Sequence, residues 1–538
     1  MNKLPHHFIP SLLFGTLLFS SAAFGQEALK VAAELPKNWH LMDYKTEGYL
    51  GINLNQAYNF LKGKKSKTVV VTTIDSGIDT LQKDLVNILW VNPNGKSANG
   101  FVNDKYGWDF LGGKDGKVDY TETTEEVRQY NKLKRDFSNL TSALPGKEKE
   151  FAFWQKVKSV YDTTITKDTN EMKDVSLEVN VLSGTNYFIK RELKLKSEET
   201  FSKADLERIT TTSDTLVQSK AVWGSVFGAA GENTNNAKIL KDISEYYAKL
   251  NNDINPDLDA RIRIVGDDPD INDGKPYGNN ILKTPDASHG TGVAGLIAAE
   301  RDNGYGIDGV ADNVRIMAIK AVPNGDEYDK DVANAIRYAV DNGAKVINMS
   351  FGKKISPHKE WVDAAFKYAA EKDVLLVMAA GNENQDVDKD PEFPNDMYLD
   401  GTTTDNVINV GASGPKMDEN LAASFSNYGK NNVDVFAPGV KVTSIDMDAE
   451  FNTADGTSFA SPIVAGVAAL ILEYYPKLSA RQVKKAILDS VTPLTGSMVI
   501  KPGTKDEKVD FTSLSKTGGI VNAYVALVNA SKMKGERK

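Results

Sequence analysis

The strongest constraint on the fold of this chain is an apolar run at residues 463–475, which directly follows the sequence Gly456-Thr457-Ser458-Phe459-Ala460-Ser461-Pro462. Such a run predicts a buried helix, and a buried helix needs a large core around it. Because proline is tolerated only near the start of a helix, this helix should begin shortly before Pro462. Ser458 then lies in the first turn, where free backbone N–H groups and the helix dipole favour developing negative charge. The position predicts a nucleophilic serine.

Alternating strand-like and helix-like segments predict the rest of the core. Residues 67–74 form a β-branched run that ends at Asp75, as expected of a strand buried on both faces of a parallel sheet. The other predicted strands cover 314–322, 345–350, 374–380 and 407–411, and the predicted helices cover 288–299, 329–342, 358–372 and 479–490. This order predicts an α/β fold, with a mostly parallel sheet and helices on both of its faces.

A segment of different composition interrupts this order. Residues 114–260 are rich in Lys, Glu, Asp, Thr and Asn, and their apolar residues recur at helical spacing, as at Phe151, Trp154 and Val157. We expect a large, mostly helical insertion here, with a pair of strands near 175–195 and a return to strand at 262–266. The predicted parts are a signal peptide at 1–25, an N-terminal extension and the first part of the catalytic domain at 26–113, the insertion at 114–260, and the rest of the catalytic domain at 261–538.

The N-terminus and the composition bear on where the protein works. Residues 1–25 hold a basic start, a short apolar stretch and small residues up to Gly25, which is the pattern of a signal peptide, so we expect export to the periplasm or the cell exterior. A formal net charge of −9 argues against nucleic acid as the main partner. No later apolar stretch of about 18 residues is expected to span a membrane. The absence of cysteine excludes disulfides and thiolate chemistry.

A serine hydroxyl needs a neutral base beside it and a third group that orients the base. Among the histidines, His289 alone lies in a glycine-rich helix start, with Ser288 as its predicted N-cap. A helix N-terminus also disfavours the imidazolium and so keeps the ring able to accept a proton. His40 and His358 are predicted to be surface residues. Asp75, at the carboxyl end of a buried strand, is the predicted orienting acid.

Three motifs in the order Asp, His, Ser carry a family resemblance. They are Asp75-Ser76-Gly77, His289-Gly290-Thr291 and the serine motif at 456–462. Together with the α/β pattern, they resemble the catalytic motifs of the subtilisin-like (subtilase) serine peptidases over roughly residues 40–113 and 262–530. The resemblance implies a triad of Ser458, His289 and Asp75 that hydrolyses polypeptide through an acyl-enzyme, with no cofactor required for the chemistry.

The resemblance also assigns the groups around the triad. It implies that the Asn382 amide donates to the oxyanion of the tetrahedral intermediate, beside the backbone N–H of Ser458. It further implies two segments that pair with an extended substrate and wall its first specificity pocket. These segments are Ser350-Phe351-Gly352 and Ala379-Ala380-Gly381. Structural calcium is expected from the family, with its ligands unassigned.

The insertion leaves alternatives open. It separates Asp75 from His289 by several times the distance found in compact family members. We interpret it as a stabilising decoration, as a lid that limits access to the cleft, or as an element for partner docking or folding. The predicted function is an exported serine endopeptidase. The alternatives are an inactive or gated binding protein on a subtilase scaffold, and an esterase or transferase that uses the same acyl-enzyme.

Overall fold

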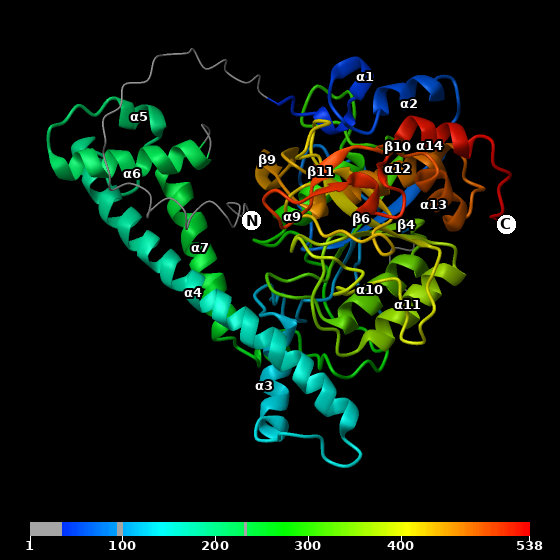
Figure 1. Cartoon of the computed structure of the whole chain (residues 1–538), viewed down its shortest axis with the longest axis horizontal. Helices are drawn as coiled ribbons and strands as arrows, with labels where there is room; N and C mark the ends of the chain where they lie inside the picture. The colour runs from blue at the N-terminus through cyan, green and yellow to red at the C-terminus, as the bar shows by residue number, and fades with distance from the viewer. Residues whose placement is uncertain (1–34, 94–99, 231–233, 538) are drawn as a thin grey trace. The chain divides into compact units, whose positions relative to one another are not determined.

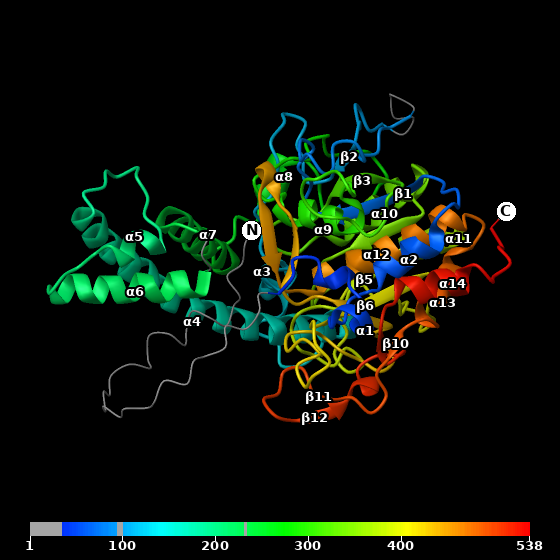
Figure 2. The same ribbon diagram turned by 90° about the horizontal axis from the view of Figure 1, so that it is seen from above.

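The computed structural model describes residues 35–93, 100–230 and 234–537, so the predicted signal peptide lies outside the described residues. The described chain forms two compact units. The main unit combines Leu35–Gln129 with Leu258–Lys538, and the helical unit is Tyr130–Asp257. Figures 1 and 2 show the main unit as a layered α/β structure and the helical unit as helices joined by loops.

The main unit is built on a nine-stranded sheet. In spatial order its strands are β10 (Thr492–Pro493), β13 (Gly519–Ile520), β7 (Val435–Pro438), β6 (Val407–Ser413), β5 (Leu375–Ala379), β4 (Val346–Met349), β1 (Val69–Asp75), β3 (Val314–Lys320) and β2 (Gly107–Asp109). All neighbours pair in parallel except β10 and β13. Two antiparallel ribbons accompany it, β8 (Val442–Ile445) with β9 (Phe451–Ala454) and β11 (Met498–Ile500) with β12 (Lys508–Asp510). The predicted mostly parallel sheet is confirmed.

Helices cover both faces of this sheet, because successive strand residues point to opposite sides and both sides are apolar. On β5, Leu375 and Val377 join one hydrophobic core, and Leu376 and Met378 join the other. The first core is closed by α2 (Leu54–Leu61), α9 (Ser288–Ala298), α12 (Thr457–Tyr474), α13 (Ala480–Leu488) and α14 (Ala523–Ala530). The second is closed by α10 (Asp329–Asp341) and α11 (Lys359–Glu371), which Figure 1 shows below the sheet.

The helix α12 runs through the middle of the first core. It is the one helix of the described chain with the length and composition to cross a membrane. In this fold, however, 89% of the helix is buried inside the protein. Its apolar character is that of a core helix.

The helical unit is held by long helices that pack on each other. Its main helices are α4 (Glu148–Glu192), α5 (Lys203–Glu207), α6 (Asp214–Ala230) and α7 (Asn236–Ile254), and α3 (Glu125–Phe137) begins in the main unit and ends here. The core between α4, α6 and α7 is apolar and aromatic, with Trp223 and Phe227 at its centre. The mostly helical insertion is confirmed.

Two strand predictions in this part of the chain were wrong. Residues 175–192 belong to α4, where Val175, Leu182 and Ile189 recur every seven residues and form one buried face. Residues 260–264 form α8 (Ala260–Ile264) and not a strand. The β-branched residues suggested strands, but Ile262 is 58% exposed and Arg261 is the buried residue.

The remaining elements are short. They are η1 (Trp39–Leu41), α1 (Tyr44–Glu47), η2 (Met447–Ala449) and η3 (Phe511–Ser513).

Candidate active site

Asp75 and His289 meet at the carboxyl end of β1. Asp75 is the last residue of this strand and is 2% exposed. Its Oδ1 accepts hydrogen bonds from the backbone N–H of Ser76 and from Nδ1 of His289, each at 2.7 Å. Because an ionised carboxylate can only accept, the proton of a neutral His289 lies on Nδ1 and the lone pair lies on Nε2. The imidazole is thereby held in the tautomer that can accept a proton.

His289 is the second residue of α9, and glycines allow its close approach to the strand. A Cβ on Gly290 would lie 2.1 Å from the backbone oxygen of Gly77, so only glycine fits there. The predicted N-cap was wrong by one residue, because Ser288 is the first helical residue and Ala287 stands at the cap without a side-chain cap bond. A tight turn before Ala287 leads the chain directly into the helix.

Ser458 is the second residue of α12, in the first turn as predicted. Its hydroxyl donates to the backbone carbonyl of Ser350 at 3.4 Å, and the described residues show no hydrogen bond between this hydroxyl and His289. The imidazole lies edge-on to the ring of the next residue, Phe459, with 6.3 Å between the centroids. The start of α12 therefore lies beside His289, while the Ser458 hydroxyl is bonded to the Ser350 carbonyl.

Buried side chains fix the start of α12. Pro462 has no N–H for the carbonyl of Ser458, one helical turn before it. The hydroxyl of Ser350 donates to that carbonyl at 3.0 Å instead. Asn348 donates to the Ser350 hydroxyl at 2.9 Å and accepts from the Ser461 hydroxyl at 3.0 Å. The Ser350 side chain, predicted at the substrate wall, thus holds the start of α12 against the sheet.

Asn382 follows β5, at the same edge of the sheet as Asp75, and β4 lies between β5 and β1. Its Oδ1 accepts from the backbone N–H of Thr457 at 2.8 Å and from the Thr457 hydroxyl at 3.0 Å. Since a backbone N–H can only donate, these bonds assign the oxygen to that side, and the amide NH₂ is turned the other way. An orientation of this kind prepares the NH₂ to donate to a developing oxyanion.

Sequence reasoning missed Asn427, which shapes the loop that carries Asn382. This side chain is fully buried. Its Nδ2 donates to the carbonyl of Ala380, and its Oδ1 accepts from the backbone N–H groups of Glu383 and Gln385, at 2.8–3.1 Å. No local motif marks Asn427, because its partners lie more than forty residues away in the sequence.

A pocket opens beside this loop and encloses about 460 Å³ of empty space, part of it open to solvent. Residues of both predicted walls line it, Phe351 and Gly352 on one side and Ala379 and Ala380 on the other. The rest of the lining comes from the segment after β5, from β6 and from the loop before β7. These residues are Val387, Pro391, Glu392, Phe393, Pro394, Asn395, Asp396, Met397, Asn409 and Asn432.

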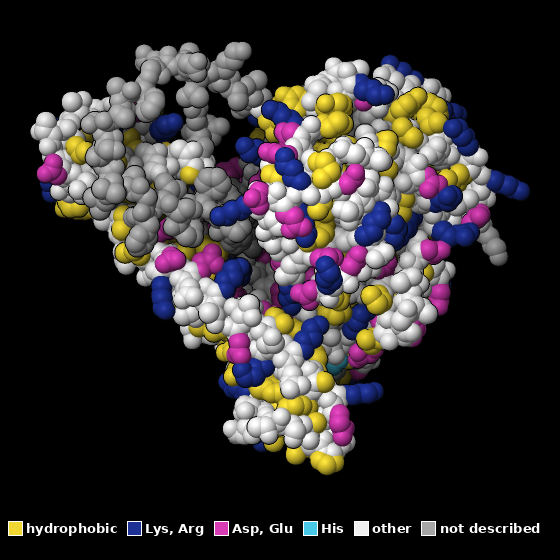
Figure 3. Space-filling view, viewed as in Figure 1, with side chains coloured by type: hydrophobic (Ala, Val, Ile, Leu, Met, Phe, Trp, Pro, Cys, Tyr) yellow, Lys and Arg dark blue, Asp and Glu magenta, His cyan; other side chains and the backbone are white. Residues whose placement is uncertain are grey.

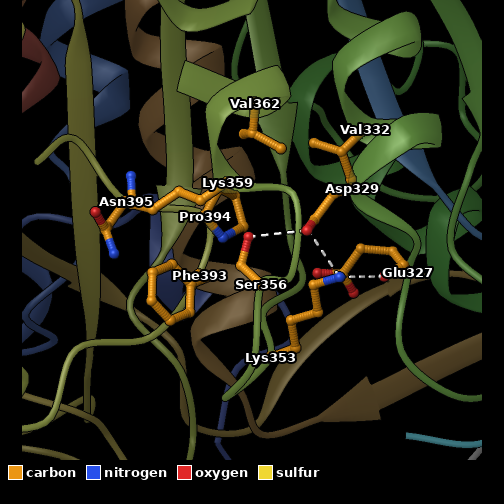
Figure 4. A pocket seen from close by; sticks show the side chains of 10 residues that line it. All are labelled: Glu327, Asp329, Val332, Lys353, Ser356, Lys359, Val362, Phe393, Pro394 and Asn395. Carbon is orange, nitrogen blue, oxygen red and sulfur yellow. Dashed lines mark hydrogen bonds and ion pairs between the residues drawn. The ribbon is translucent and has the colours of Figure 1, made fainter. Parts of the chain in front are cut away.

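A second, smaller pocket lies behind the wall segment and encloses about 250 Å³ (Figure 4). Lys353 lies in it, pairs with Asp329 at 2.9 Å and donates to the carbonyl of Glu327 at 2.6 Å. Ser356 donates to the same Asp329 carboxylate at 3.0 Å. Figure 4 shows these polar groups converging on one another, so they satisfy each other within the wall.

The two other histidines of the main unit have different surroundings from those predicted. His40 is 2% exposed and neither ring nitrogen has a hydrogen-bond partner, so the prediction of a surface position was wrong. Burial lowers the pKa of His40 to about 3. His358 is half-buried, stacks on Trp361 at 3.9 Å and lies 3.1 Å from Asp270, which raises its pKa.

Charge and metal-binding groups were also predicted from the sequence. Figure 3 shows acidic and basic side chains interspersed over the face of the main unit in view. Within the described residues, no group of three or more His, Asp or Glu side chains is arranged to hold a metal ion. The expected structural calcium stays a prediction without a carboxylate site.

A family model and several known proteins are similar to this chain. The family model described as "Subtilase family" matches residues 66–512. The thermophilic serine proteinase of Bacillus sp. (strain AK1) is 42% identical over 218 residues, which are 40% of this chain and 48% of that protein. Subtilisin DY of Bacillus licheniformis is 39% identical over 219 residues, 40% of this chain and 74% of that protein.

Solved structures also match. One described as proteases from Pseudoalteromonas arctica PAMC 21717 aligns with 92% of this chain and 97% of that chain, at 20% identity and a TM-score of 0.45. The alignment to the strain AK1 proteinase spans about half of that relative's length.

Proposed function

The chain belongs to the subtilase family, and from that premise we propose that it is an exported serine endopeptidase that cleaves polypeptide through an acyl-enzyme. One observation carries the proposal, namely that Asp75, His289 and the starts of α9 and α12 come together at one edge of the sheet. Export is supported by relatives named as a cell wall-associated protease and a minor extracellular protease.

In the proposed mechanism, His289 takes the proton of Ser458 through Nε2 while Asp75 holds Nδ1. Ser458 Oγ attacks the peptide carbonyl, and the oxyanion accepts hydrogen bonds from the Asn382 NH₂ and the Ser458 N–H. His289 then gives the proton to the leaving amine, and water attacks the acyl-enzyme by the same route. The hydroxyl must first turn from the Ser350 carbonyl toward His289, a change that substrate binding commonly brings about.

The substrate is proposed to lie between the two wall segments, 350–352 and 379–381. Both follow neighbouring parallel strands, β4 and β5, so they leave the sheet side by side. Their backbone groups would pair with an extended polypeptide whatever its side chains. Phe351, Gly352, Ala379, Ala380 and Gly381 are proposed to contact the substrate.

The test is active-site labelling combined with proteolysis. The purified protein should react once with a fluorophosphonate and digest casein, and Ser458→Ala should abolish labelling and lower kcat by roughly a millionfold. Ser531→Ala, at the end of α14, is the matched control with unchanged activity. Digestion that survives Ser458→Ala would refute the proposal. Labelling without digestion would favour an esterase, and neither activity would favour the binding scaffold.

The role of Asn382 is tested separately. Asn382→Ala should lower kcat by about 10²–10³-fold while KM changes little, because the lost hydrogen bond forms in the transition state. Equal losses for Asn382→Ala and Ser458→Ala would mean that the loop had collapsed, which circular dichroism and the melting temperature would reveal.

A further inference from the structure

The pocket between the two wall segments is lined by carboxyl groups as well as by apolar side chains. Glu392 lines this pocket, and its side chain is 12% exposed. A Cβ placed on Gly381 would be 2.5 Å from Glu392 Oε2, and a Cβ placed on Gly352 would be 3.5 Å from the same oxygen. Oε2 therefore lies between the walls, one residue from Asn382.

The other oxygen of this carboxylate has a cation. Lys354, just beyond the first wall, pairs with Glu392 Oε1 at 2.6 Å and also contacts the side-chain oxygen of Gln385. Glu383, in the loop after β5, faces Glu392 from the second wall and accepts from Asn427 at 2.9 Å. Glu392 thus has a lysine at one oxygen and a second carboxyl group facing it.

Asp396 adds a second carboxyl to the pocket lining, together with the amides of Asn395, Asn409 and Asn432. None of the residues that line this pocket is a lysine or an arginine. The lining also contains the apolar side chains of Phe351, Val387 and Phe393. A pocket that combines apolar side chains with carboxylates suits a long aliphatic side chain that carries a cation at its tip.

We infer that this pocket binds the substrate side chain on the acyl side of the cleaved bond, and that Glu392 selects lysine and arginine there. The inference rests on the proposed function, because the pocket adjoins the amide assigned to the oxyanion. The ammonium or guanidinium of the substrate meets Oε2 of Glu392, while Lys354 keeps Oε1. Glutamate at this substrate position is rejected by the same carboxylates.

Titration of the carboxyl pair gives the selection a pH dependence. Burial and the charge of Glu383 raise the pKa of Glu392 to about 8, so near neutral pH the pair holds a proton. A substrate cation displaces that proton to solvent. The facing charged groups are Glu383 and Lys354, with Asp396 on the same loop as Glu392. The advantage of a basic side chain therefore grows as the pH rises from about 7 to 9.

The experiment compares kcat/KM for peptides that differ only at the residue before the cleaved bond. Lysine and arginine should exceed norleucine by at least about tenfold and glutamate by more. Glu392→Gln should lower the lysine-to-norleucine ratio by about tenfold, and Lys354→Met should raise it, because a competing cation is removed. The ratio cancels any titration of His289, which acts on all substrates alike.

Asp390→Asn is the matched control, since this exposed residue stands two positions from Glu392 outside the pocket lining. It should leave the ratio unchanged. Melting temperature and fluorophosphonate titration of Ser458 count the folded, reactive fraction of each variant. A labelled enzyme that prefers norleucine, or a ratio that Glu392→Gln does not move, overturns the inference but leaves the proposed function standing. An enzyme that neither labels nor cleaves overturns both.

Discussion

The main unit and the helical unit bury charge in different ways. In the main unit, buried ions come in sets, as where Arg128 lies 2.7 Å from Glu125, and Lys353 lies 3.1 Å from the same carboxylate. Burial opposes the ionisation of Glu125, but the charges of Arg128 and Lys353 outweigh it and lower its pKa to about 2. Arg261 and Asp331 form a second buried pair, with two hydrogen bonds of 2.7 Å.

The helical unit also has a buried pair, Lys249 with Asp253, but it buries Glu178 with no cation beside it. Burial raises the pKa of Glu178 to about 7 and that of Asp168 to about 6. Glu178 Oε2 is buried and has no hydrogen-bond partner. Glu125 and Glu178 therefore differ in whether a cation compensates the buried carboxyl group.

The largest effect is expected from removing a buried cation from the main unit. Lys353→Met leaves Glu125 and Asp329 buried without that partner and should lower the free energy of unfolding of the main unit by about 3–5 kcal/mol. Denaturant unfolding followed by hydrogen exchange in β1 measures it. Lys367→Met, which removes an exposed pair with Asp400, should have a much smaller effect because solvent screens that pair. Equal effects of the two variants would mean that the buried set is not stabilising.

The corresponding change in the helical unit is an aromatic truncation. Phe227→Ala removes a ring that is 1% exposed and should destabilise this unit by about 3–5 kcal/mol. Exchange at amides of α4 should accelerate while Ser458 keeps its reaction with a fluorophosphonate. Tyr187→Ala, at a side chain that is 61% exposed, is the control. Loss of Ser458 labelling in Phe227→Ala would show that the two units unfold together.

Removing a lone buried carboxyl should stabilise the helical unit. The folded unit keeps the proton of Glu178 up to about pH 7, whereas an unfolded chain releases it near the ordinary value of 4.5. The free energy of unfolding of this unit therefore decreases as the pH rises from about 4.5 to 7. Glu178→Met should increase that free energy by about 2 kcal/mol at pH 8 and by less at pH 5. Exchange in α4 at both pH values measures this, with exposed Glu192→Met as control. A gain that is equal at the two pH values would contradict the role of ionisation.

The smallest effect is expected for the stability of the main unit at acid pH. His40 is neutral in the fold because burial lowers its pKa to about 3, and an unfolded chain takes up the proton near 6.5. Above pH 6.5 His40 is neutral in both states and has no cost for folding. As the pH falls from 6.5 toward 3, protonation of the unfolded chain lowers the stability of the main unit. His40→Phe removes this effect and should stabilise the main unit at pH 5 by about 1 kcal/mol. In His358 the pKa is raised instead, so His358→Phe should show no such gain in acid.

Much of the catalytic edge could be predicted from local sequence. The apolar composition of the run before Asp75 and of the stretch after Ser458 predicts that both are buried. Parallel strands then bring their carboxyl ends to one edge of the sheet. The misplaced strand pair near 175–195 has a clear cause. Val175, Leu182 and Ile189 suggested strands one by one, and only their spacing of seven along α4 shows a helix face.

By itself, the sequence determined the order of strands and helices, the triad candidates and the start of α12, because each depends on a few consecutive residues and their periodicity. Tertiary structure decided the rest. It placed His40 inside, turned the Asn382 amide by way of Thr457, and set Glu392 between Gly352 and Gly381. These arrangements depend on which distant side chains meet, and the free energy of burying a polar group is set by that partner and not by the neighbours along the chain.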